Sequence, residues 1–200
     1  MRAVKFGARE FASDGATLFG VFCAGCHGPD GMGRRLPGLV SFPSIANPDF
    51  LALASDEFLA ETVKNGRPGR RMPGWLKDGG LRPDEIRAVV AYVRSLGVPV
   101  APVPVPAVPA AGAPQNGKRI FQTACSGCHG LDGKGGEGPA LNNRVLLQSA
   151  SEAYLMGTIR HGRRGTAMAS FLDPSPVRQA LTESDIADVV AYLRSFEGVK

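Results

Sequence analysis

Residues 18–28 read LFGVFCAGCHG and residues 120–130 read IFQTACSGCHG, and these two stretches decide how the chain is organised. Each contains the pattern Cys-x-x-Cys-His, and the two copies lie 102 residues apart. Together they use all four cysteines of the chain. Self-similarity on this scale is the signature of a repeated structural unit. The pattern therefore predicts that the chain contains one domain twice.

Two further blocks repeat in the same order. NGRPGRRM at 65–72 matches HGRRGTAM at 161–168, and IRAVVAYVRS at 86–95 matches IADVVAYLRS at 186–195. The offsets of these blocks are 96 and 100 residues, and such small shifts fit changes in loop length, which folds tolerate well. We therefore expect an N-terminal arm at 1–13, a first domain at 14–97, a linker at 98–114 and a second domain at 115–200.

The linker reads VPVAPVPVPAVPAAGAP and holds six prolines in 17 positions. Such a composition favours polyproline II, which rises about 3.1 Å per residue, so the segment could span on the order of 50 Å. A plain spacer is the preferred interpretation, and a docking motif for a domain that binds proline-rich peptides is the alternative.

Each copy is predicted to be a small all-helical domain, because strand signals are weak throughout. A short helix leads into the cysteine motif, a glycine-rich segment follows, and a longer helix closes the copy. The first closing helix shows apolar residues at helical spacing, namely Ile86, Val89, Val90, Val93 and Leu96. Helices are expected to start at Asp14, Asn116, Pro83 and Thr182 with Asp185. The two closing helices are expected to end at a glycine in the left-handed conformation, Gly97 and Gly198.

Cys-x-x-Cys-His is the attachment signature of c-type haem. The two thiols, Cys23 with Cys26 and Cys125 with Cys128, would add to the two vinyl groups of one porphyrin. The following histidine, His27 or His129, would then ligate the iron. The alternatives are a thioredoxin-like dithiol, which needs a βαβ context absent here, and a four-cysteine zinc site bridging the halves. The motifs favour two covalently bound haem c groups.

At these residues the chain resembles class I cytochromes c, over residues 14–97 and 116–197. The resemblance implies an all-α fold of two tandem cytochrome c-like domains joined by a Pro-rich linker. It rests on Gly15-x-x-Leu18-Phe19 and Gly117-x-x-Ile120-Phe121 in the first helices and on Tyr92 and Tyr192 in the closing helices, which the resemblance implies cross the first ones. It also rests on Gly138-Pro139-x-Leu141, which resembles the loop beside the proximal histidine. Pro37-Gly-Leu39 is the looser match to that loop in the first copy.

The resemblance also implies a distal methionine. Met72 lies 45 residues after His27, where the family places this ligand, and Met168 is its counterpart in the repeat. His161 is the competing ligand in the second copy, although it aligns with Asn65. Met32 lies too close to His27 to reach the opposite haem face, and Met156 lies on a probable helix. The predicted iron ligands are thus His27, Met72, His129 and Met168.

Three other side chains are singled out near these motifs, and each has two interpretations. Trp75 follows Met72 by three residues and either touches the haem edge or simply packs in the core. Arg67 and Arg163 either pair with haem propionates or are solvated charges.

Composition narrows the class of partner. The net charge is +5, with 13 basic and 10 acidic residues at 1–98 and 10 and 8 at 99–200, which disfavours nucleic acid. No apolar run is long enough to cross a bilayer. Residues 1–10 lack an export signal, yet haem is attached outside the cytoplasm, so we expect a periplasmic location or the outer face of the cytoplasmic membrane.

These patterns predict an electron carrier rather than an enzyme, because His/Met ligation closes the iron to substrates. We expect redox protein partners: a quinol-oxidising complex or a dehydrogenase as donor, and a terminal oxidase as acceptor. The chain would be a free carrier or a subunit of a membrane-bound respiratory or photosynthetic complex. The alternative is a dihaem enzyme of the peroxidase or thiosulfate-oxidising type, whose catalytic haem has an open site or an unusual ligand.

Overall fold

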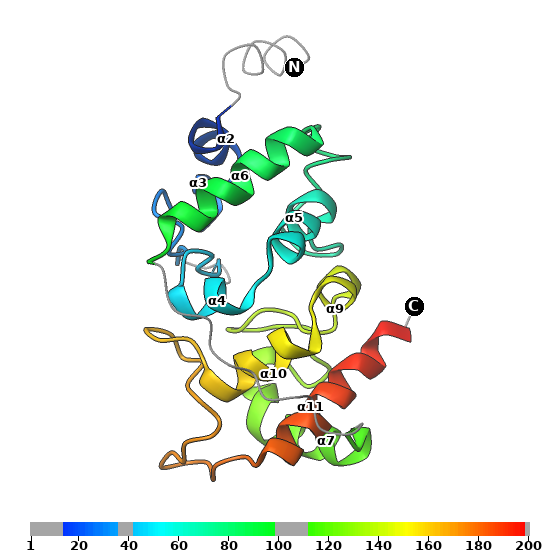
Figure 1. The fold of residues 1–200 in the computed structure, drawn as a ribbon. Helices are drawn as coiled ribbons and strands as arrows, with labels where there is room; N and C mark the ends of the chain where they lie inside the picture. The colour runs from blue at the N-terminus through cyan, green and yellow to red at the C-terminus, as the bar shows by residue number, and fades with distance from the viewer. Residues whose placement is uncertain (1–13, 36–41, 99–111, 199–200) are drawn as a thin grey trace.

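The computed structural model describes residues 14–35, 42–98 and 112–198, and Figure 1 shows two helical halves stacked one above the other. The first half contains α2 (Gly15–Phe22), α3 (Ala24–His27), α4 (Pro48–Leu53), α5 (Asp56–Asn65) and α6 (Pro83–Leu96). The second contains α7 (Pro114–Ile120), the π-helix η1 (Phe121–Cys125), α8 (Ser126–His129), α9 (Arg144–Ser149), α10 (Glu152–His161), α11 (Glu183–Ser195) and the 3-10 helix η2 (Phe196–Gly198).

The described residues contain helices and two isolated β-bridges but no strand, so the all-α prediction is confirmed. None of the helices in the described ranges combines the length and apolarity needed to cross a bilayer. The predicted arm at 1–13 and linker residues 99–111 lie outside the described residues. Pro114, assigned to the linker from the sequence, is the first residue of α7.

The first and last helices of each half cross at a glycine. A Cβ on Gly15 would lie 2.0 Å from the Ala88 carbonyl oxygen, and one on Gly117 would lie 1.9 Å from that of Asp188. No side chain larger than hydrogen fits there, so these glycines set the approach of α2 to α6 and of α7 to α11. The resemblance predicted this crossing.

Aromatic pairs lock the same crossings. The ring centroids of Phe19 and Tyr92 are 5.3 Å apart, and those of Phe121 and Tyr192 are 5.4 Å apart. Both phenylalanines are almost fully buried. Each aromatic pair at this separation adds about 0.5–1.5 kcal/mol beyond the burial of its two rings. The tyrosine of the closing helix therefore packs on the first helix, as expected.

The predicted helix ends are partly right. Asp14 caps α2 by accepting from Thr17 N at 2.9 Å, Pro83 opens α6, and Thr182 with Asp185 caps α11. Asn116 was wrongly placed, because α7 starts two residues earlier and the Asn116 amide instead donates to the Asp188 carboxylate at 2.7 Å.

The predicted left-handed stops are wrong. Gly97 has φ −82°, an extended conformation, and its lack of a side chain makes room for Leu51, whose Cδ1 lies 2.2 Å from where a Cβ would be. Gly198 belongs to the 3-10 turn of η2. The requirement at Gly97 is thus space and not a positive φ.

The two halves share one buried apolar cluster and contact each other through equivalent elements. Helix α4 packs against α10, and α5 packs against α9. Since α9 and α10 are the counterparts of α4 and α5, the contact has pseudo-two-fold symmetry. Near its centre the rings of Phe58 and its counterpart Tyr154 stack with centroids 4.6 Å apart. The domains therefore form a fixed pair in this structure.

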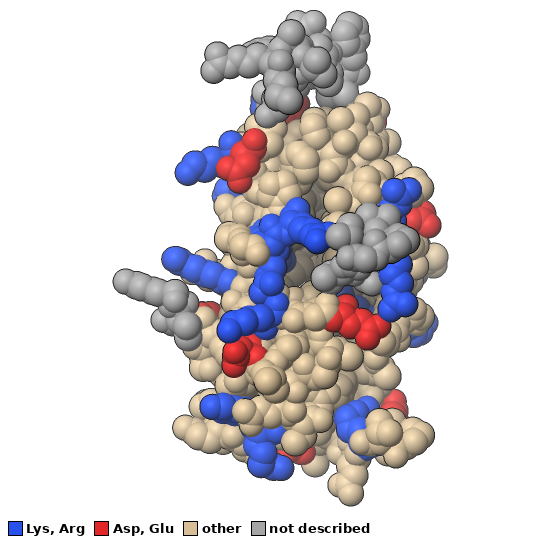
Figure 2. All heavy atoms as spheres, turned by 180° about the vertical axis from the view of Figure 1, so that it is seen from behind, with Lys and Arg blue, Asp and Glu red and all other residues tan. Residues whose placement is uncertain are grey.

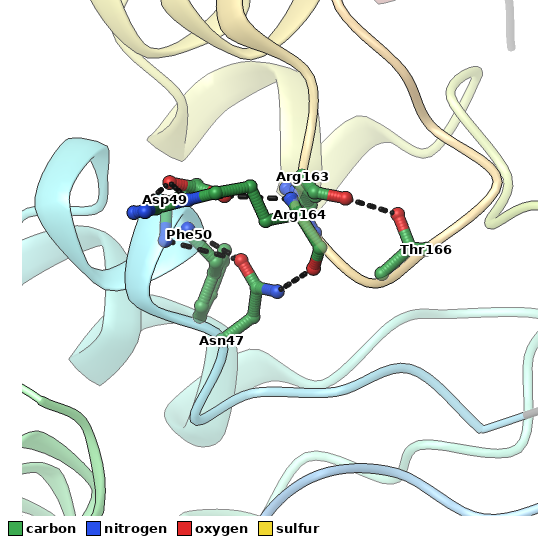
Figure 3. A network of polar contacts seen from close by, with 6 residues as sticks. All are labelled: Asn47, Asp49, Phe50, Arg163, Arg164 and Thr166. Carbon is green, nitrogen blue, oxygen red and sulfur yellow. Dashed lines mark hydrogen bonds and ion pairs between the residues drawn. The ribbon is translucent and has the colours of Figure 1, made fainter.

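Matching hydrogen bonds flank that centre on both sides. Asn47 caps α4 and donates from Nδ2 to the Arg164 carbonyl at 2.9 Å, whereas Asn143 caps α9 and donates to the Pro68 carbonyl at 3.1 Å. Figure 3 shows the first of these contacts, with Asn47 and Asp49 facing the loop of Arg164. Each cap side chain thus stabilises its own helix and the neighbouring domain together.

Candidate functional site

The cysteine motif lies at the same bend in both halves. His27 N donates to the Cys23 carbonyl at 2.9 Å, which closes one helical turn between the first cysteine and the histidine. The turn ends at Gly28, with φ 81°, and at Gly130, with φ 77°. Both positions favour glycine because residues with a side chain rarely adopt a positive φ. Both thiols of a motif therefore leave one short helix, with the histidine directly behind them.

The two histidine rings are held in one tautomer. Nδ1 of His27 lies 2.9 Å from the Pro43 carbonyl oxygen, and Nδ1 of His129 lies 2.7 Å from that of Pro139. A carbonyl only accepts hydrogen bonds, so Nδ1 carries the proton and Nε2 presents its lone pair. Burial lowers the pKa of both histidines and outweighs the hydrogen bond to the prolyl carbonyl, which raises it. A neutral imidazole with a free Nε2 is what an iron ligand requires.

A proline beside the proximal histidine was predicted in both halves, as Pro139 and more loosely as Pro37, and the second half has it as expected. Pro139 lies where the sequence indicated, and Gly138 beside it is required because a Cβ there would lie 2.9 Å from Cε1 of His129. In the first half Pro43 performs this role. Pro37, the residue proposed from the sequence, lies outside the described residues.

The cysteines do not have the properties of a reactive dithiol. Cys23 and Cys125 are half-buried against the core, and Cys26 and Cys128 are exposed. Burial raises the pKa of the Cys23 and Cys125 thiols to about 11, whereas redox-active cysteines have lowered values. Among the described residues no three His, Cys, Asp or Glu side chains gather as metal ligands, so the motifs do not form a four-cysteine zinc site.

Met72 and Met168 occupy equivalent turns. Arg67 N donates to the Met72 carbonyl at 2.8 Å, and Arg163 N donates to the Met168 carbonyl at 2.6 Å. Each turn needs its glycine: Gly66 and Gly162 have positive φ, and a Cβ on either would lie about 2.5 Å or less from the methionine carbonyl. Both methionine side chains are partly exposed. Met168 is thus the structural counterpart of Met72.

The competing candidates occupy other elements of the fold. His161 ends α10 and lies close enough to Asp49 of the first domain to help lower the pKa of that carboxyl, after the larger effect of Arg164. Met32 is exposed in a turn, and Met156 is fully buried in α10. Trp75 packs against Phe22, with ring centroids 5.1 Å apart, which accounts for its position without a haem contact.

Arg67 and Arg163 are partly buried rather than fully solvated. Burial lowers the pKa of Arg67 to about 10, and its guanidinium donates to the uncharged Thr62 Oγ1 at 2.8 Å. Arg163 donates to the Tyr154 hydroxyl at 2.7 Å and lies 4.8 Å from the ring centroid of Phe50 in the other domain. No carboxylate of the described residues pairs with either guanidinium. Partly buried cations of this kind favour an anionic neighbour.

Arg94 and Arg194 were not predicted from the sequence, yet they hold the ends of α4 and α9, the short helices at the domain contact. Arg94 of α6 donates to the carbonyls of Leu51 and Ala54, and Arg194 of α11 does the same for Leu147 and Ala150. These bonds satisfy the last carbonyls of α4 and α9, which have no partner within the helix. Both arginines stand in the repeated blocks VVAYVRS and VVAYLRS, and that repetition was the available signal.

Comparison with known proteins gives each half a family. Residues 114–197 match the family "Cytochrome c", and residues 10–93 match "Cytochrome C oxidase, cbb3-type, subunit III". A chain of the Kuenenia stuttgartiensis reducing HAO-like protein complex has a similar fold, with TM-score 0.54 and 20% identity over 91% of this chain and 94% of that one. Because the identity is low, this likeness concerns the fold alone.

Curated relatives extend the similarity across both halves. The chain is 36% identical over 177 residues to the cbb3-type cytochrome c oxidase subunit FixP of Bradyrhizobium diazoefficiens, covering 82% of this chain and 57% of that protein. It is 31% identical over 197 residues to subunit CcoP of Rhodobacter capsulatus, covering 92% and 62%. The chain thus spans about three fifths of the length of these relatives. With its two Cys-x-x-Cys-His turns and its two matched families, the chain is a dihaem c-type cytochrome, built of two tandem class I cytochrome c domains that bind two haem c groups.

Proposed function

We propose that this cytochrome is a one-electron relay and an electron-transfer subunit of a membrane-bound terminal oxidase of the cbb3 type. The observation that carries the proposal is the duplicated site: a histidine with a free Nε2 and a matching methionine turn in each half. Similarity to FixP and CcoP over both halves supports the oxidase as partner.

The residues present fit the haem group, and we assign its attachment to them. Cys23 with Cys26, and Cys125 with Cys128, would hold the two porphyrins through thioethers. His27 with Met72, and His129 with Met168, would ligate the irons. Haem c supplies a one-electron iron couple when bound, and histidine–methionine ligation favours a high potential. The chain keeps the imidazoles neutral, orients them through prolyl carbonyls and holds each methionine in a glycine-dependent turn.

The arginines at the domain contact suit the haem carboxylates. Arg67 and Arg163 are equivalent in the repeat, are partly buried and have uncharged hydrogen-bond partners. A propionate beside each guanidinium would neutralise a cation that is costly to bury alone. We therefore assign these two arginines to the propionate side of the haem pockets, and this places both pockets next to the domain contact.

The location and direction of electron flow follow from the proposed assembly. The haem domains would lie in the periplasm or at the outer face of the cytoplasmic membrane. Electrons would arrive from a quinol-oxidising complex or a dehydrogenase and leave toward the oxidase. The two domains form one packed pair, so electrons need not wait for a domain movement to pass between the halves.

Carbon monoxide binding separates a carrier from a haem enzyme. With both irons capped by methionine, the reduced holoprotein should bind carbon monoxide only slowly at neutral pH, because a ligand must first leave. Stopped-flow spectroscopy measures this rate for each haem. Rapid binding at one haem would favour the dihaem enzyme instead.

The oxidase assignment has its own test. Purification from the native membrane at low salt should recover the cytochrome together with an oxidase that consumes oxygen. Recovery as a free protein, with oxygen consumption left in another fraction, would contradict the subunit role and leave the relay chemistry intact.

A further inference from the structure

The two sides of the domain contact differ in charge although the fold repeats. On one side, Arg164 of the second domain donates from its backbone N to the Asp49 carboxylate at 2.6 Å and forms an ion pair with it at 2.7 Å (Figure 3). We call this the closed side. The Arg164 guanidinium holds the pKa of Asp49 below its ordinary value. The protein thus supplies its own anion here.

The opposite side, which we call the open side, has no such pair. The positions equivalent to Asp49 and Arg164 are Val145 and Pro68, and of the closed-side contacts the asparagine bond alone has an equivalent here, from Asn143 to the Pro68 carbonyl. A further ion pair between the domains, Arg35 with Glu137 at 2.8 Å, joins two exposed side chains that do not line the cleft described next. A cleft of about 370 Å³ lies on the open side. Both domains line it, through Pro68, Gly69, Arg70, Lys134, Asn142, Asn143 and Arg144.

The lining of this cleft carries three cations and no acid. Arg70 comes from the first domain, and Lys134 and Arg144 come from the second. Their counterparts on the closed side are Thr166, Met32 and Pro48, all uncharged. The basic lining is therefore particular to the open side and is not a by-product of the duplication.

Little within the protein neutralises these charges. Lys134 pairs with Asp132 at 3.0 Å, but both side chains are about two thirds exposed, and such pairs contribute little. The described residues provide no carboxylate for the side chains of Arg70 or Arg144. Figure 2 shows several Lys and Arg side chains, with fewer Asp and Glu beside them, across the middle of one face of the molecule. Three like charges around one hollow repel each other and attract a multivalent anion.

We propose that the open side is a binding site for a small multivalent anion of the phosphate class, shared by the two domains. Guanidinium groups bind phosphate oxygens through paired hydrogen bonds, and the cleft volume is in the range of small-molecule sites. The lining lacks the aromatic and methionine side chains that anchor protein partners, which favours a small hydrophilic ligand. A bound anion would hold the domains together as Asp49 does on the closed side.

Calorimetry on the holoprotein tests this site, with pyrophosphate as the probe at constant ionic strength. Pyrophosphate should bind saturably with one site per chain and raise the melting temperature. The double variant Arg70→Gln/Arg144→Gln should weaken binding about tenfold or more, because each lost guanidinium removes a charge-assisted contact. The matched control is Arg87→Gln, which removes an exposed charge on α6 outside the cleft and should leave the affinity unchanged.

Three results would overturn the proposal. Absence of saturable binding would mean that the holoprotein's own groups, its haem carboxylates included, already neutralise the cleft. A loss of binding free energy in the double variant only about twice that in Arg87→Gln, as two removed charges against one would give, would mean diffuse attraction by net charge. Binding of a hexaglutamate peptide without binding of pyrophosphate would assign the surface to an acidic protein partner. None of these results depends on the proposed electron-transfer role.

Discussion

The two domains differ most where they enter the cysteine motif and where they meet. In the first domain α2 runs directly to Cys23, whereas in the second a π-helical turn, η1, carries the chain from α7 to Cys125. The histidine carbonyl partner lies 16 residues after His27 but only 10 residues after His129. Yet both paths give the same ring tautomer and the same methionine turn. The repeat therefore preserves the geometry of the candidate iron ligands while the loops around them vary.

Removing one cysteine pair should have the largest effect, because the two domains should then differ in haem content. Cys125→Ala with Cys128→Ala should leave a protein with one haem, because each domain attaches its own group through its own thiols. Mass spectrometry of the denatured chain counts the covalent haems, and Cys23→Ala with Cys26→Ala is the matched variant. Loss of both haems from either double variant would mean that one domain matures only with the other.

The methionine turns should be equivalent when tested separately. Met72→Ala and Met168→Ala should each open one iron and lower the potential of that haem, because a thioether ligand favours ferrous iron. His161→Ala should leave both haem spectra unchanged, since the repeat aligns His161 with Asn65 and aligns Met168 with Met72. Magnetic circular dichroism reports the ligands. An open second haem in His161→Ala but not in Met168→Ala would make this half bis-histidine.

The cap asparagines should have similar, moderate effects. Asn47→Ala and Asn143→Ala each remove a helix cap and a bond to the other domain, and an N-cap alone is worth about 1 kcal/mol. We expect each variant to lose about 1–2 kcal/mol of unfolding free energy, measured by chemical denaturation of the holoprotein. Ser55→Ala, which removes only the cap of α5, is the control and should lose less.

Lowering the pH should have a smaller effect on stability, through the Asp49–Arg164 pair of the closed side. The pKa of Asp49 is lowered, so its pair with Arg164 adds stability above the ordinary value of 3.8, and the stability is lost as pH falls through the lower folded value. The melting temperature of Asp49→Asn should therefore lie below that of the native chain at pH 7 and approach it toward pH 3. A constant difference across this range would mean that the carboxylate charge contributes nothing.

The sequence predicted the features that depend on repetition and local chemistry. The duplicated blocks indicated two all-helical domains, and Asp14, Pro83 and Thr182 marked helix starts because capping needs only neighbouring residues. Asn116 misled, because a distant carboxylate, Asp188, competes for its amide.

The domain contact could not be predicted in the same way. Asn47, Asn143 and the Phe58–Tyr154 stack acquire their roles from residues about 75 to 117 positions away or from the other domain's surface. Local patterns carry no information about such partners. The repeat did align Arg67 with Arg163, but only packing shows that Arg67 is largely buried and that Arg163 lies over Phe50 of the other domain.

We propose that each half builds its own closed histidine–methionine haem site. The most direct measurement is the weak absorption band near the red end of the oxidised spectrum, which reports methionine bonded to iron, divided by the haem content of the same sample. We predict full intensity for two haems, and half that intensity in Met72→Ala and in Met168→Ala alike. Intensity for only one haem in the native chain would contradict the claim and identify one half as a site with a different or missing distal ligand.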